Sequence, residues 1–105
     1  MAVEKWKSWL PVEYSAADVE LVQALNGGVA NADQQRRALA FIVGTMCRTY
    51  EPSFDPESAR NTDHAEGRRW VGLQLVKMTK LSLGDLRARE AQQERKSHER
   101  NARGK

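Results

Sequence analysis

Residues 63–76 read DHAEGRRWVGLQLV, and this stretch decides how the fold of the chain is interpreted. Its apolar residues recur at helical spacing, yet it contains two glycines, each of which costs about 1 kcal/mol relative to alanine inside a helix. Around Gly67 a helical wheel gathers one broad apolar face, made of Trp70, Val71, Leu75, Met78 and Leu81. We therefore expect Gly67 to leave space for a closely packed neighbouring helix or for the indole ring of Trp70.

This helix is predicted over residues 62–81, with Thr62 as its N-cap. Asp63 and Glu66 then fall in the first turn, where acidic side chains complement the helix dipole. Gly72 lies at the border of the apolar face and is predicted to serve a second neighbour. Arg68 is expected to reach an acid or the carbonyls at a helix end, and Glu66 to pair with an arginine.

Two further core helices are predicted before it. Ser15 with Asp18 three residues later is a good start signal for a helix over residues 16–25, which Asn26-Gly27-Gly28 ends. A second helix is expected after Asn31, over residues 32–50, ending before Pro52. Its predicted core face is Leu39, Ile42, Val43, Met46 and Tyr50.

Small residues form a strip on an adjoining side of the second helix, at Ala40, Gly44 and Cys47. They are predicted to let another backbone approach closely, with Trp70 of the third helix among the packing residues. Cys47 is the only cysteine, so we interpret it as a small buried apolar residue. Phe54, in the turn between the helices, is expected to pack back onto the core.

The C-terminal segment differs from the rest in composition. Ser82 can cap a fourth helix with Asp85 in its first turn, and residues 85–105 hold seven Lys/Arg and four acids, a net charge of +3 that equals that of the whole chain. The sequence thus predicts an all-α fold of three core helices plus an extended charged C-terminal helix. Its predicted parts are a Trp-rich arm (1–14), a helical domain (15–81) and a charged helix or tail (82–105).

Composition and motifs exclude several classes of protein. The 105 residues suit a single small domain, the apolar residues are too interrupted for a membrane span, and no signal peptide is visible. One cysteine and two histidines offer no zinc spacing, and no phosphate loop or nucleophile motif is present. We expect no cofactor, no metal and no enzymatic activity.

Two stretches of the chain carry a family resemblance: FIVGTMCRTYEPSF at residues 41–54 and NTDHAEGRRWVGLQLVKM at residues 61–78. Together they resemble the Bbp-nineteen-like phage domain family of short-tailed phages, over about residues 35–81. The family pattern T-x-x-x-E-G-R-R-x-x-G-L is matched in order and spacing by Thr62, Glu66, Gly67, Arg68, Arg69, Gly72 and Leu73. The resemblance implies a virion or assembly role rather than a metabolic one.

The first hypothesis for function is therefore a non-enzymatic phage structural protein at the head, the portal vertex or the ejection apparatus. The resemblance implies host cytoplasm during assembly, then the virion, as its location. It implies other phage structural proteins such as the portal, or further copies of itself, as partners. Trp6 and Trp9, one turn apart on a helix, would anchor a partner, or equally cap the protein's own core.

The second hypothesis is a small basic protein that binds nucleic acid non-specifically through its tail. Its candidate phosphate contacts are Arg87, Arg89, Arg95, Lys96, Arg100 and Arg103. The acids interspersed among these residues and the absence of aromatic residues for base stacking place this hypothesis second.

Overall fold

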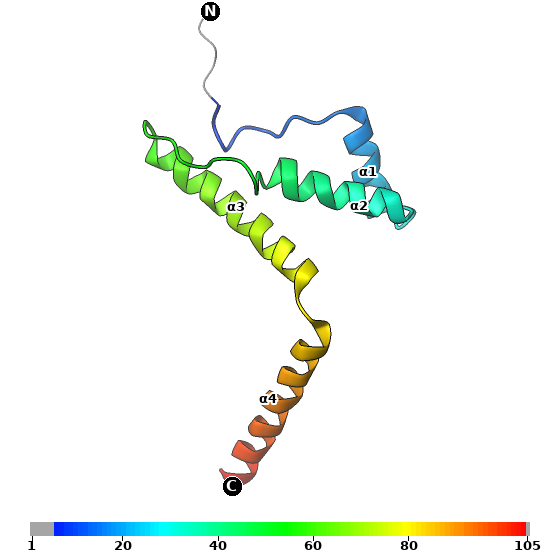
Figure 1. The fold of residues 1–105 in the computed structure, drawn as a ribbon, viewed down its shortest axis with the longest axis vertical. Helices are drawn as coiled ribbons and strands as arrows, with labels where there is room; N and C mark the ends of the chain where they lie inside the picture. Colours follow the sequence, from blue (N-terminus) through cyan, green and yellow to red (C-terminus); the bar gives the residue numbers. More distant parts are fainter. Residues whose placement is uncertain (1–5, 105) are drawn as a thin grey trace, which may run out of the picture.

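A computed structural model describes residues 6–104, which form an all-α protein with no strand in that range (Figure 1). The elements are α1 (Ala16–Asn26), α2 (Ala32–Phe41), a π-helical turn η1 (Ile42–Met46), α3 (Ala59–Lys80) and α4 (Leu83–Arg103). The predicted all-α fold with an extended C-terminal helix is confirmed. Residues 1–5 of the predicted arm and residue 105 of the predicted tail lie outside the described residues.

Local capping signals set the starts of three helices as predicted. The Asp18 N–H donates to Ser15 Oγ at 3.2 Å, and Asp18 Oδ2 accepts from the Ser15 N–H at 2.9 Å. Asn31 and Gln34 repeat this reciprocal cap at α2, and Ser82 Oγ accepts the Asp85 N–H at 3.3 Å to begin α4. These bonds satisfy N–H groups that a helix start leaves unpaired.

The predicted continuous helix over residues 32–50 is wrong. The α-helix ends at Phe41, passes into the wider turn η1 and stops at Cys47, whose N–H donates to the Ile42 carbonyl at 2.9 Å. The Thr49 hydroxyl then donates a hydrogen bond to the Val43 carbonyl at 2.7 Å. A π turn holds one extra residue, which rotates all later side chains around the axis. Val43 is buried, whereas Met46 and Tyr50 are exposed instead of lying in the core.

The third helix begins earlier than predicted. Ser58, not Thr62, is the N-cap, because its hydroxyl accepts the Asn61 N–H at 3.1 Å. As a result the first turn of α3 holds no acid, and the predicted dipole role of Asp63 and Glu66 is wrong. The physical reason lies in the preceding turn, where the Thr62 hydroxyl oxygen accepts the Asp55 N–H at 2.8 Å.

The packing face of α3 is also not the predicted one. The buried positions are Asn61, Ala65 and Gly72, whereas Trp70 is 62% exposed and Gly67 is exposed too. A Cβ atom added to Gly67 would meet nothing within 4 Å, so this glycine accommodates no neighbour within the chain. Small and polar residues face inward because α3 packs against backbone of η1, of the following loop and of the N-terminal arm.

The predicted strip of small residues is wrong at two of its three positions. Ala40 is exposed, and a Cβ atom on Gly44 would have nothing within 4 Å. Cys47 alone is buried and closely packed, as predicted for it. Phe54 is 76% exposed and does not pack onto the core, because the turn that carries it is held by polar bonds.

Little apolar surface is buried in the described part of the chain. Its buried apolar residues are Leu21, Ala38, Val43, Cys47 and Ala65. Among these residues α1 packs on α2 and α3 packs on η1, while α4 contacts no other helix. Figure 1 shows α4 projecting away from the other helices, and the molecule measures 73 × 40 × 22 Å. The core therefore occupies only one end of an elongated molecule.

Candidate interaction site

At Gly72, on the inner face of α3, this helix lies very close to the residues that follow η1. A Cβ atom at this position would lie 1.7 Å from Thr49 Oγ1 and 2.9 Å from both Thr49 Cβ and Cys47 Cβ. Thr49 is almost completely buried there and its hydroxyl is held by the Val43 carbonyl. The packing of this helix therefore requires a glycine at position 72. The sequence placed Gly72 at the border of the predicted apolar face.

Arg68 joins three parts of the chain. Its Nε donates to the Met46 carbonyl at 2.9 Å, a second nitrogen donates to the same oxygen, and Nη1 donates to the Ser8 carbonyl at 2.7 Å. Met46 ends η1, where carbonyl groups lack helical partners and a positive charge is favourable. The prediction that Arg68 reaches carbonyls at a helix end is confirmed. Burial, and then the charge of Arg48, lowers the pKa of Arg68.

Arg69 and Glu66 hold the loop that follows η1. Arg69 Nε donates to the Thr49 carbonyl at 3.2 Å and lies near Glu66, with 4.0 Å between Nη1 and Oε2. Glu66 Oε1 also accepts a hydrogen bond from the Ser53 hydroxyl. The predicted pairing of Glu66 with an arginine is confirmed.

Together the family-pattern residues divide into two groups by location. Thr62, Glu66, Arg68, Arg69 and Gly72 all contact residues 46–55 or the N-terminal arm. Gly67 and Leu73, in contrast, are exposed. Most of the matched residues thus hold one irregular loop and the N-terminal arm against α3.

The N-terminal arm is bound to α3 through Ser8, which is almost completely buried. Its N–H donates to Asn61 Oδ1 at 2.6 Å and its hydroxyl donates to the Asn61 carbonyl at 3.1 Å. Around Ser8 the chain forms a turn, not the helix that the spacing of Trp6 and Trp9 suggested.

Both tryptophans of the arm are partly covered by residues of their own chain. The Arg48 guanidinium lies 4.1 Å from the Trp6 ring centre, and that of Arg60 lies 4.8 Å from the Trp9 ring centre. Each tryptophan remains 38% exposed. They are thus partly covered, with cationic side chains over their rings, an arrangement that stabilises the arm.

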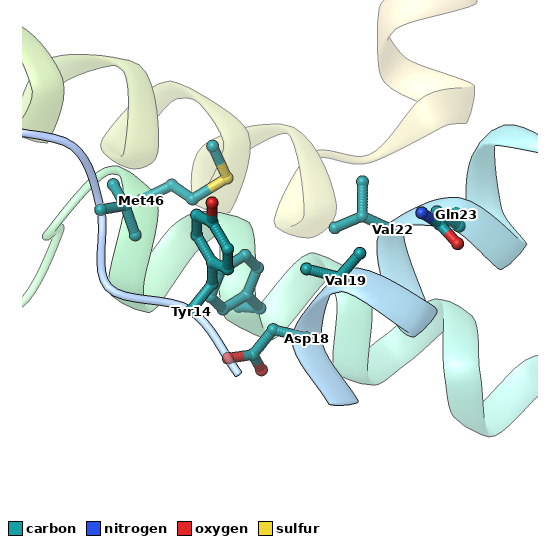
Figure 2. Close-up of a pocket in the computed structure, with 8 residues that line it drawn as sticks. Tyr14, Asp18, Val19, Val22, Gln23 and Met46 are labelled. Atoms are coloured by element: carbon teal, nitrogen blue, oxygen red, sulfur yellow. The ribbon is translucent and has the colours of Figure 1, made fainter. Parts of the chain in front are cut away.

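An apolar groove lies between the arm, α1 and the end of α2 (Figure 2). Its volume is about 360 Å³, and its lining is mostly apolar, from Val12, Tyr14, Val19, Val22, Phe41 and Met46. Asp18 and Gln23 are its polar lining residues, and Asp18 is already used in the cap of α1. Val19 and Val22, three residues apart in the sequence, were the available signal for this groove.

The remaining candidate residues lie on exposed surfaces. Trp70, predicted to pack between helices, lies on the outer face of α3. All six predicted phosphate-contact residues are exposed on α4. Within residues 6–104 no cluster of metal-ligating side chains is present, and no helix there is long and apolar enough to cross a membrane.

Comparisons with known protein families, with curated proteins and with solved structures give no match for this chain. The resemblance to the phage family rests on the residue pattern alone and stays a prediction.

Proposed function

We propose that this chain is a non-enzymatic virion or morphogenesis protein of a short-tailed phage, acting as an interaction module at the head, the portal vertex or the ejection apparatus. The observation that carries the proposal is the imbalance between its small core and its exposed apolar surface. Beyond the groove, Trp70, Met78 and Leu83 are more than half exposed on the two long helices. Large exposed apolar areas of this kind mark protein interaction sites.

The arrangement of the family-pattern residues supports the same role. Arg68, Arg69 and Thr62 fix a loop and an arm by hydrogen bonds to main-chain groups, which stiffens one end of the molecule. A preorganised surface loses less conformational entropy on binding than a mobile one. The module would occur in several copies and contact other phage structural proteins, the portal among them, in host cytoplasm during assembly and then in the virion.

Mass spectrometry of purified particles from a phage that encodes this chain tests the proposal. We expect the chain in mature particles, in more than one copy per particle. Its absence from both mature particles and assembly intermediates would overturn the proposal.

A second function, non-specific binding of duplex DNA, is favoured by the way the α4 helix sorts its charges. With about 100° between successive residues, Arg89, Lys96, Arg100 and Arg103 share one side of α4. Glu90 and Glu94 lie toward the opposite side. Asp85 and Glu99, however, lie within or beside this row of basic residues, so only two of the four acids are separated from it. The arrangement lessens the repulsion that the sequence suggested only in part.

This second function predicts which residues of the tail matter. Replacing Arg89, Lys96 and Arg100 with glutamine should weaken binding to random duplex more than tenfold at low salt. Replacing Arg87 and Arg95, which lie on other sides of α4, should have a smaller effect. If four phosphates are neutralised, the log-log slope of affinity against salt is about −3.6. No binding by the full chain at low salt would exclude this function.

A further inference from the structure

The outer face of α3 carries apolar side chains with no covering element among the described residues. Trp70 and Met78 are 62% and 63% exposed, and Val71 and Leu81 are also exposed. Trp70, Val71 and Met78 lie on the side of α3 away from the buried Ala65 and Gly72, with Met78 seven residues, or two turns, after Val71, and Leu81 follows as the C-cap. This is the spacing with which one helix packs along another.

The charges beside this face are distributed unequally along the helix. Asp63 and Glu66 lie in the N-terminal half of α3, and Lys77 and Lys80 lie near its C-terminal end. Asp63 and Lys80 are equally far from a point between residues 71 and 72, and so are Glu66 and Lys77. A twofold axis at that point would bring each acid of one copy opposite a lysine of the other. Parallel pairing would instead set acid against acid and lysine against lysine.

We propose that the outer face of α3 binds the same face of a second copy of this chain in antiparallel orientation. Trp70 lies beside the twofold axis and Met78 lies farther along the helix, next to Lys77. Glu66 and Asp63 of one copy face Lys77 and Lys80 of the other. The paired region between residues 63 and 80 is about 26 Å long at 1.5 Å per residue. Apolar burial supplies the affinity and the flanking charges set the orientation, because exposed ion pairs contribute little by themselves.

Gly67 fits this arrangement. It lies on the outer face one turn before Trp70, and no atom of its own chain comes within 4 Å of the position its Cβ would take. The space beside it is open to the side chain of a partner helix. The described residues of the N-terminal arm bind α3 through Asn61 and Arg68, and Trp9 lies against Arg60 and His64 in the first turns of the helix.

Sedimentation velocity of the full chain over a range of concentrations tests the pairing. We expect a dimer, with Trp70→Glu and Met78→Glu each shifting the dissociation constant more than a hundredfold toward monomer. The matched control is Phe54→Glu, which places the same charge on an equally exposed aromatic residue outside α3 and should leave the dimer intact. A monomeric parent chain, or an assembly that Trp70→Glu does not weaken, would overturn the inference.

Charge reversal tests the orientation. Asp63→Lys alone should weaken self-association roughly five- to tenfold, because each copy then presents a lysine to a lysine at both ends. Asp63→Lys combined with Lys80→Asp should restore the parent affinity. Equal affinity for all three chains would exclude antiparallel pairing.

The dimer is a property of the chain in solution, so its failure would leave the proposed virion role standing, and absence from virions would leave the dimer standing.

Discussion

At the scale of single residues, the two glycines of α3 have different physical roles. Gly72→Ala would force Cβ into the buried Thr49 side chain, so we expect a loss of about 1–3 kcal/mol in the free energy of unfolding. Gly67→Ala meets no atom of the chain and should stabilise the helix by up to about 1 kcal/mol. Urea unfolding in the Trp70→Glu background, which removes the proposed pairing, measures both effects. The opposite order of stability would contradict the packing described at Gly72.

Arg68 is the second residue whose replacement should affect the whole molecule. Arg68→Lys keeps the charge but cannot bind the Met46 and Ser8 carbonyls with a planar, forked group. We expect a loss of about 2 kcal/mol, typical of hydrogen bonds to charged groups, and a change in tryptophan fluorescence as the arm detaches. Arg87→Lys on the exposed surface of α4 is the control. Equal unfolding curves for the two variants would show that Arg68 does not hold the arm.

At the scale of elements, the starts of α1, α2 and α4 could be predicted from sequence, whereas the start of α3 and the buried faces of the helices could not. Ser15, Asn31 and Ser82 act within three residues of their own position, so their capping is a local property. The π turn at Ile42–Met46 has no comparable local signal, and it rotated the predicted core face of the second helix. The inner face of α3 was misassigned because Arg68 and Arg69 bind main-chain carbonyls there and Gly72 lies against the Thr49 and Cys47 side chains, so that no large apolar residue is needed on that face.

The independence of α4 is testable by truncation after Gly84. Because α4 contacts no other helix, its removal should leave the midpoint of thermal unfolding unchanged while the far-ultraviolet helical signal falls. An isolated polar helix of this length is marginal in water, so the lost signal should be smaller than a complete helix would give. A clearly lower midpoint in the truncated chain would show that α4 stabilises the remaining helices.

At the scale of the whole molecule, the shape itself is evidence for function as part of an assembly. The radius of gyration of the Cα atoms is 20.3 Å, whereas a compact chain of about 100 residues has about 13 Å. A single chain of this shape leaves apolar side chains on α3 and around the groove exposed to water. The length indicated a single small domain, but only the structure shows that much of the apolar surface of the described residues lies outside the core.

Small-angle X-ray scattering of the monomeric Trp70→Glu chain tests whether this shape persists without a partner. We expect a radius of gyration near the 20.3 Å of the structure, because α4 makes no contact with another helix that would hold it folded back. Truncation after Gly84 should reduce the value markedly, since the projecting helix contributes most to the long axis of the molecule (Figure 1). A full-length monomer with a radius of gyration near that of a compact chain would mean that α4 covers the apolar face of α3 within one chain. That result would remove the surface on which the proposed pairing depends.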